Sequence, residues 1–151
     1  MEAFLRPGDC FLVHYGDVVT DQDFTAMLRL HRQRGALATL LLHRRRASNS
    51  VVSLDEEGRI VEFLERPTAQ ARRPGQPHWV NSGVCLLGPE VFAHIPADTA
   101  CDLPADIFPK LIPTGRLFGF PLSGSRFAID SPRRLAQARA AIREGNLRIK
   151  N

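Results

Sequence analysis

The sequence has few cysteines and no long hydrophobic run, and each absence excludes a class of protein. Its three cysteines, Cys10, Cys85 and Cys101, are an odd number without the paired spacing of metal ligands, which argues against a disulfide framework or a zinc site. No stretch approaches the roughly 18 consecutive apolar residues of a membrane span, and the opening segment lacks the apolar run of a secretory signal. We therefore expect a cytoplasmic protein with no membrane partner.

Basic residues outnumber acidic ones, but their arrangement does not indicate a nucleic-acid-binding surface. The net charge of +4 would attract anionic partners at long range. The positive residues cluster at 43–46, 72–73 and 133–134, without the interleaved aromatic residues that stack on bases. We interpret these clusters as solvated loops and helix faces, and we expect no nucleic-acid partner.

The first third of the chain predicts alternating strands and helices of an α/β domain. With 44% hydrophobic and 24% charged residues, the composition is that of one ordinary globular domain. The apolar segment 11–15 predicts a strand, and an amphipathic helix capped by Asp21 or Asp23 follows it. The near-continuous apolar run 36–42 predicts a strand covered on both faces, so the opening is typical of a βαβ unit in a parallel sheet.

The rest of the chain alternates short strands with turns and helices. Gly58 ends a four-residue turn and predicts a β-hairpin between segments 51–54 and 59–64. Ser131 is a suitable N-cap for a terminal helix that has Pro132 at its first position. The remaining predictions are a proline- and arginine-rich loop at 67–77, a strand at 79–87, short helices at 89–94 and after Asp102, and strands at 116–122 and 127–129.

Asp17 is the first candidate for chemistry. It follows Tyr15 and Gly16 where the first predicted strand ends, which is where ligands bind in open α/β sheets. A carboxylate at this position can hold Mg²⁺, and Gly16 lets a nucleotide approach the backbone. An aspartate after a glycine also fits a simple turn, so the residues alone leave both interpretations open.

Two further polar groups stand in positions that call for a reason. Glu65 and Arg66 place a carboxylate and a cation side by side, which can bind a sugar hydroxyl and a phosphate together or form an exposed charge pair of little energetic value. Asn81 and Gly83 interrupt an apolar strand, which indicates either a ligand close to the backbone or a β-bulge.

Taken in order, these segments resemble the NDP-sugar pyrophosphorylases, the sugar-1-phosphate nucleotidyltransferase family that includes mannose-1-phosphate guanylyltransferases. The resemblance covers nearly the whole chain and rests on several short motifs in the family's order. These are Phe11–Asp21, Gly35–Thr39, Leu54–Ile60, Glu65–Pro67, Val80–Val84, Asp106–Pro109, Gly115–Gly119 and Asp130–Pro132.

The resemblance implies a fold and a reaction. The fold is an incomplete, Rossmann-like three-layer α/β nucleotidyltransferase fold, with a mixed, mostly parallel sheet and an added β-hairpin. The reaction is nucleotidyl transfer, in which a sugar-1-phosphate oxygen attacks the α-phosphorus of a nucleoside triphosphate and pyrophosphate leaves. Mg²⁺ and cationic side chains would stabilise the charge that develops.

The resemblance also assigns roles to residues. Asp17 and Arg66 would be catalytic, and Mg²⁺ would be held by Asp17 with Asp130. The substrates would be bound by Tyr15, Gly16, Glu65, Arg66, Asn81 and Gly83.

The chain departs from the family pattern at four places. The glycine-rich Gly-Gly-x-Gly-Thr-Arg-Leu loop, which wraps the triphosphate, has no counterpart, so we expect 1–151 to be a single partial domain without the nucleotide-binding half. The family's Tyr-Gly falls on Asn49–Ser50, and its lysine is replaced by Arg66. Ala128 stands where the second metal aspartate belongs, and Asp130, on the same strand face, would replace it only with a shift.

These departures leave two functions open. One is nucleotidyl transfer by an enzyme of which this chain is a truncated form. The alternative is a non-catalytic sugar-phosphate-binding or interaction module that pairs with another chain. Because the absent half would supply central strands, we expect an unpaired sheet edge, covered by a partner chain or a second copy.

Overall fold

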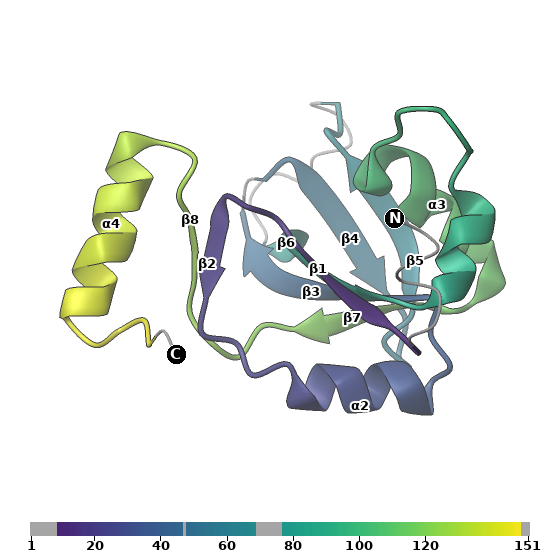
Figure 1. Ribbon diagram of the computed structural model, residues 1–151, viewed down its shortest axis with the longest axis horizontal. Coiled ribbons are helices and arrows are strands. Elements are labelled where there is room, and N and C mark those ends of the chain that lie inside the picture. Colours follow the sequence, from purple (N-terminus) through teal and green to yellow (C-terminus); the bar gives the residue numbers. More distant parts are fainter. Residues whose placement is uncertain (1–8, 47, 69–76, 149–151) are drawn as a thin grey trace.

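The central feature of the structure is a six-stranded mixed sheet in which the longest strand, β6, pairs with three others (Figure 1). This computed structural model describes residues 9–46, 48–68 and 77–148. The strand order is β5-β4-β6-β3-β7, with β1 also paired to β6. The strands are β1 (Phe11–His14), β3 (Ala38–Arg45), β4 (Ser50–Leu54), β5 (Ile60–Glu65), β6 (His78–Leu87) and β7 (Leu117–Pro121).

A smaller unit lies beside this sheet. Strands β2 (Val18–Thr20) and β8 (Arg126–Ala128) form an antiparallel pair, and helix α4 (Pro132–Arg143) packs against β8, away from the main sheet (Figure 1). The strand predicted at 127–129 is therefore confirmed, shifted by one residue, but it pairs outside the main sheet. Strand β2 was not predicted from the sequence.

Helices cover both faces of the main sheet. Helix α2 (Thr25–Gln33) contributes Met27 to the core on one face. The other core contains Phe108 and Leu111 of α3 (Phe108–Leu111). Three further short helices lie on the chain between β6 and β7: the 3-10 helices η1 (Pro89–His94) and η3 (Ile112–Thr114) and the π-helical segment η2 (Leu103–Ile107).

The predicted strand with two buried faces is confirmed in β3. Side chains alternate along a strand, so Leu40 and Leu42 pack into one core while Leu41 packs into the other. All three side chains are fully buried. This burial makes β3 the strand on which both helical layers are built.

The α/β class and the mixed sheet are confirmed, but the expectation of a mostly parallel sheet is corrected. Among the strands of the described residues only β3 and β7 pair in parallel, whereas the other pairs are antiparallel. β1 and β3 do run in the same direction, as a βαβ unit requires, but β6 lies between them and runs antiparallel to both. A strand inserted from later in the chain leaves no mark on the pattern of the opening segment.

Local predictions about turns and caps are confirmed in part. The hairpin joins β4 to β5, and Gly58 in its turn has φ of +81°. Ser131 caps α4 by accepting a hydrogen bond from the Arg134 backbone N–H. The predicted cap of α2 by Asp21 or Asp23 is corrected: Phe24 holds the N-cap position without a side-chain bond, and Asp23, one residue earlier, accepts a hydrogen bond from the Thr25 N–H. Asp102 does not cap the next helix with its side chain. Its backbone N–H instead donates to Asp106 Oδ2 at 2.7 Å.

Two remaining expectations concern edges and membranes. Along its other edge, β1 pairs with no strand of the described ranges, which fits the expected open edge. In those same ranges, no helix has the length and apolar character needed to cross a bilayer. Most of the predicted loop at 67–77, including Arg72 and Arg73, lies outside the described residues.

Candidate functional site

The candidate site lies where β6 changes partners. β1 pairs with the end of β6, from Val84 to Leu87, whereas β4 pairs with it at Trp79. On the opposite edge, Leu40 pairs with Cys85 and Leu42 with Asn81, so two steps along β3 correspond to four along β6. The two extra residues form a β-bulge, which confirms one of the two interpretations of the polar interruption at 81–83.

Two side chains and the Tyr15 backbone satisfy backbone groups that the bulge releases. The Asn81 N–H donates to Ser50 Oγ at 2.9 Å, and the Gly83 N–H donates to Asn81 Oδ1 at 3.1 Å. The Tyr15 N–H donates to the Gly83 carbonyl at 2.9 Å. Along this edge of β6, β1 and β4 leave a gap that no strand of the described residues fills. The hydrogen bonds above stabilise the backbone at this gap.

Gly83 has two reasons to be glycine. Its φ is +80°, a region that residues with a Cβ rarely adopt. A Cβ there would also lie 3.1 Å from both Tyr15 Cδ2 and Val18 Cγ2. The glycine therefore lets the Tyr15 and Val18 side chains pack against the bulge.

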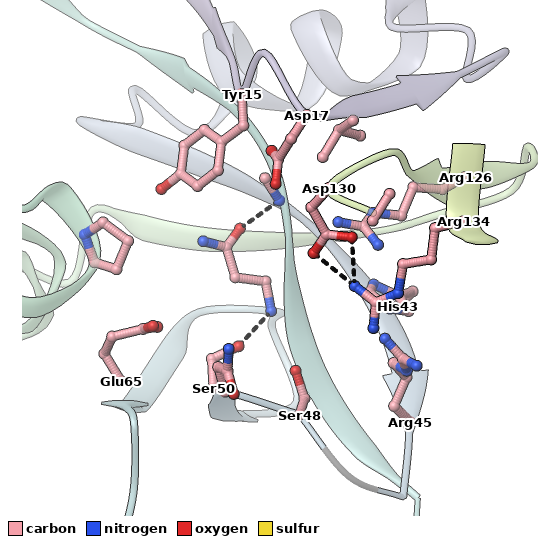
Figure 2. Close-up of a pocket in the computed structure, with 16 residues that line it drawn as sticks. Tyr15, Asp17, His43, Arg45, Ser48, Ser50, Glu65, Arg126, Asp130 and Arg134 are labelled. Atoms are coloured by element: carbon pink, nitrogen blue, oxygen red, sulfur yellow. Dashed lines mark hydrogen bonds and ion pairs between the residues drawn. The ribbon is translucent and has the colours of Figure 1, made fainter. Parts of the chain in front are cut away.

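A pocket of about 410 Å³ opens at this bulge (Figure 2). Its size is within the range of small-molecule sites. It is lined by residues from both sheets, the η2 segment and α4: Tyr15, Asp17, Val18, His43, Arg45, Ser48, Asn49, Ser50, Glu65, Asn81, Gly83, Pro104, Arg126, Ala128, Asp130 and Arg134.

One side of the pocket carries neutral polar groups and a carboxylate. Figure 2 shows Tyr15, Ser50 and Glu65 on this side. Burial raises the pKa of Glu65, the charge of Asp102 adds to that rise, and Arg66 opposes it. Burial also raises the pKa of Tyr15 to about 12, so its hydroxyl stays protonated and can donate a hydrogen bond.

The opposite side is cationic. Figure 2 shows His43, Arg45, Arg126 and Arg134 gathered there. Arg126 Nε donates to the Ser82 carbonyl at 3.0 Å, and burial and then the charge of Arg45 lower the pKa of its guanidinium. His43 Nδ1 lies 2.9 Å from Ser82 Oγ, and burial, followed by Arg126 and Arg45, lowers its pKa to about 4. His43 is therefore neutral at pH 7.

Two carboxylates, Asp17 and Asp130, also line the pocket on or near the cationic side (Figure 2). Asp130 is engaged by Arg134, whose Nη1 lies 2.7 and 3.0 Å from its two carboxylate oxygens. Within the described ranges no group of three histidine, cysteine or carboxylate side chains could hold a metal ion. Mg²⁺ binds through one or two carboxylates when substrate phosphates complete its shell, and Asp17 with Asp130 fits only that kind of site.

The structure brings together Tyr15, Asp17, Glu65, Asn81, Gly83 and Asp130 of the predicted site residues, with Ala128 beside them. Gly16 is not among the residues that line the pocket. Arg66 lies outside it as well: its φ is +48°, its side chain is 77% exposed, and its Nη2 lies 3.9 Å from Asp102 Oδ2. Asn49 and Ser50, which replace the family's Tyr-Gly, line the pocket.

Sequence reasoning missed the cationic side. His43, Arg45 and Arg134 were interpreted as parts of solvated clusters, and Arg126 was not singled out. Within the first cluster Arg44, Arg45 and Arg46 are exposed, as that interpretation expects, but Arg45 also lines the pocket. Arg44 instead stacks on Trp79, with its guanidinium 4.6 Å from the ring centroid. The sequence did contain one signal for this side of the pocket. Side chains alternate between the two faces of a strand, so His43 and Arg45 must lie on the same face at the end of β3.

Comparisons with known proteins agree on one family. A family model described as "Nucleotidyl transferase" matches residues 1–124. Over 114 residues the chain is 35% identical to a UTP-glucose-1-phosphate uridylyltransferase of Synechocystis sp., covering 73% of this chain and 29% of that protein. It is 26% identical over 129 residues to the probable mannose-1-phosphate guanylyltransferase 1 of Oryza sativa subsp. japonica, covering 83% and 34%.

The fold also has a solved counterpart. A putative glucose-1-phosphate thymidylyltransferase from Bacillus anthracis, crystallised in complex with a sucrose, superposes with a TM-score of 0.77 at 19% identity. The match covers 99% of this chain and 60% of that one, and at this identity it supports the fold alone. The chain spans about a third of the length of the curated relatives that it matches.

Proposed function

Since this chain belongs to the nucleotidyl transferase family, whose model matches residues 1–124, we propose that its pocket binds a sugar 1-phosphate as the acceptor in nucleotidyl transfer. The observation that carries the proposal is a single pocket with hydroxyl, amide and carboxylate groups on one side and cations on the other. A sugar phosphate has the same polarity, since its hydroxyls donate hydrogen bonds at one end and its phosphate carries charge at the other.

The pocket residues support specific roles. Glu65 and Asn81 are placed to hold sugar hydroxyls, because a carboxylate and an amide accept the hydrogen bonds that hydroxyls donate. The Tyr15 ring forms an apolar surface for the sugar, and its hydroxyl remains a donor at neutral pH. The cationic side neutralises the phosphate and lowers the electrostatic cost of bringing two phosphorylated substrates together.

The proposed reaction is a substitution at phosphorus. An oxygen of the sugar phosphate forms a bond to the α-phosphorus of a nucleoside triphosphate. The bond from that phosphorus to the bridging oxygen of the β-phosphate breaks, and pyrophosphate leaves with the electron pair. The chain's own contribution is to orient the acceptor phosphate and offset its charge.

Mg²⁺ would be held by Asp17 and Asp130 together with substrate phosphates, and it would neutralise charge on the phosphates during the transfer. Because the chain spans about a third of its relatives' length, we propose that it supplies the sugar-phosphate side. A further segment or partner chain would supply the nucleotide side, and the open edge of β1 is a surface on which it would add.

A second candidate function is a non-catalytic sugar-phosphate-binding module that pairs with another chain. It is favoured by Ala128 at the family's second metal position and by the engagement of Asp130 with Arg134. Both features would weaken metal binding, and neither removes a group that we assign to the sugar phosphate.

Two measurements test the proposal. Calorimetric titration with α-D-glucose 1-phosphate or α-D-mannose 1-phosphate should give saturable binding that glucose alone does not reproduce, and its absence contradicts both functions. Pyrophosphate release from a panel of nucleoside triphosphates and hexose 1-phosphates with Mg²⁺ then separates them. Turnover that Asp17→Ala abolishes supports the enzyme, whereas binding without turnover supports the module.

A further inference from the structure

The cationic side of the pocket borders two hollows. Next to the main pocket lies a second hollow of about 240 Å³, lined also by Leu122, Phe127 and Gln137. The two hollows share a seam, which we define as the residues that line both: His43, Arg45, Arg126, Ala128 and Arg134. An anion at this seam would meet cations from β3, β8 and α4 at once.

The seam carries more positive charge than its carboxylates offset. Arg134 is paired with Asp130 at 2.7 Å. In the described part of the chain neither Arg45 nor Arg126 forms an ion pair, although Asp17 and Asp130 lie close enough to act on Arg126 at longer range. Arg45 instead acts on Arg126 as a like charge. An anion between these two arginines would relieve that repulsion.

Arg126 is held in a fixed orientation. Its Nε donates to the Ser82 carbonyl at 3.0 Å, and Ser82 is fully buried in the bulge. This bond leaves the two terminal nitrogens of the guanidinium for a ligand, and a fork of that shape matches two oxygens of a phosphate. A guanidinium fixed before binding loses little side-chain entropy when the anion arrives.

Arg66, the cation that the family motif would assign to the phosphate, lies elsewhere. Its side chain is 77% exposed and is nearest to Asp102 Oδ2, at 3.9 Å. It borders a different hollow, formed with Pro67, Pro104 and Pro109.

We propose that Arg126 and Arg45 hold the phosphate of the sugar 1-phosphate at the seam. The inference rests on the proposed function, and it fixes the orientation of the substrate: the hexose lies toward Glu65 and Asn81, and the anionic end lies toward β8 and the end of β3. Arg66 makes no direct contact with the phosphate in this arrangement.

The test measures binding of two probes, α-D-glucose 1-phosphate and inorganic phosphate, to the full chain by calorimetry. Arg126→Gln and Arg45→Gln should each weaken both probes by about tenfold or more, the size of one lost charge-assisted hydrogen bond. Arg66→Gln and the matched control Arg139→Gln, an exposed arginine on α4, should change affinity by less than about twofold.

Glu65→Gln separates the inference from the proposed function. This variant should weaken the binding of α-D-glucose 1-phosphate and leave the binding of inorganic phosphate unchanged. If Glu65→Gln and Arg66→Gln weaken the sugar phosphate while Arg126→Gln and Arg45→Gln do not, the inference is wrong and the function stands. Inorganic phosphate could instead bind in an Arg126-dependent manner while α-D-glucose 1-phosphate binds no more tightly than inorganic phosphate. In that case the proposed function is wrong and the anion site stands.

Two further readouts guard against misfolding. Arg126→Lys keeps the charge without the fork, so it should recover part of the affinity that Arg126→Gln loses, whereas no recovery contradicts a phosphate contact. Amide shifts on titration with inorganic phosphate should be largest at 43–45 and 126–130. Shifts concentrated at 64–67 would overturn the inference, and the absence of binding by either probe overturns both proposals.

Discussion

Substitution of Gly83 tests whether the bulge sets the position of Tyr15. A Cβ at this residue would face backbone strain at φ of +80° and contacts of 3.1 Å with the side chains of Tyr15 and Val18. Positive φ costs a residue with a Cβ about 1–2 kcal/mol. Overpacking of a filled site costs about 1–3 kcal/mol more. Gly83→Ala should therefore lower the free energy of unfolding by about 2–5 kcal/mol.

Gly145 supplies the matched control. Its φ is +75°, and a Cβ there would have no heavy atom within 4 Å, so Gly145→Ala carries the strain without the contacts. Gly145→Ala should lower the free energy of unfolding by about 1–2 kcal/mol. Urea denaturation of both variants and the wild type measures the difference.

The difference between the two variants isolates the contact with Tyr15 and Val18. Gly83→Ala should also weaken binding of α-D-glucose 1-phosphate, since the displaced Tyr15 ring lines the pocket, whereas Gly145→Ala should not. Equal losses of stability would refute the claim that Gly83 makes room for the Tyr15 ring. A Gly83→Ala variant as stable as the wild type would refute the backbone argument as well.

Three further predictions concern stability. Gly119→Ala should cost about 1–3 kcal/mol in urea denaturation, because its Cβ would lie 2.5 Å from Leu42 Cδ1; an unchanged midpoint contradicts this. Ser131→Ala should cost about 1 kcal/mol by loss of the cap to the Arg134 N–H, and Ser131→Asn, which can still cap, should lose much less. The pKa of His43 is about 4 in the fold and about 6.5 when unfolded, so the unfolded state binds the proton first. Stability should therefore fall as pH drops from about 6.5 toward 4, and His43→Gln should fall less steeply in urea titrations at each pH; parallel curves would contradict the assignment.

Local features of the fold could be predicted because each depends on nearby residues. The hairpin follows from Gly58 and its turn, and the terminal helix follows from Ser131 before Pro132. The pairing of β6 between β1 and β3 could not be predicted, because it joins residues 33 to 76 positions apart and leaves no local pattern. The balance of parallel and antiparallel pairs therefore differed from expectation, although the elements themselves were largely predicted.

The site was predictable where its residues interrupt a pattern. Asn81 and Gly83 stand out because they break an apolar strand, and Asp17 stands out because it ends one. Arginines do not stand out in this way, since a surface cluster and a pocket wall have the same composition. Arg126 lines the pocket because β8 pairs with β2 beside it, a tertiary fact that its own neighbours in sequence do not encode.

The pocket is a consequence of how β6 is shared among its neighbours. β1 and β4 pair with different parts of one edge of β6, and the bulge between those parts releases backbone groups that no strand satisfies. Ser50 Oγ and Asn81 Oδ1 accept the released N–H groups, so both side chains hold the bulge open as well as lining the pocket. A loss of binding after substitution of Asn81 would therefore mix a structural effect with a lost ligand contact. Arg126 also donates to the Ser82 carbonyl of the bulge, so among the cations of the seam it is Arg45 whose substitution gives the cleaner measure of what the pocket binds.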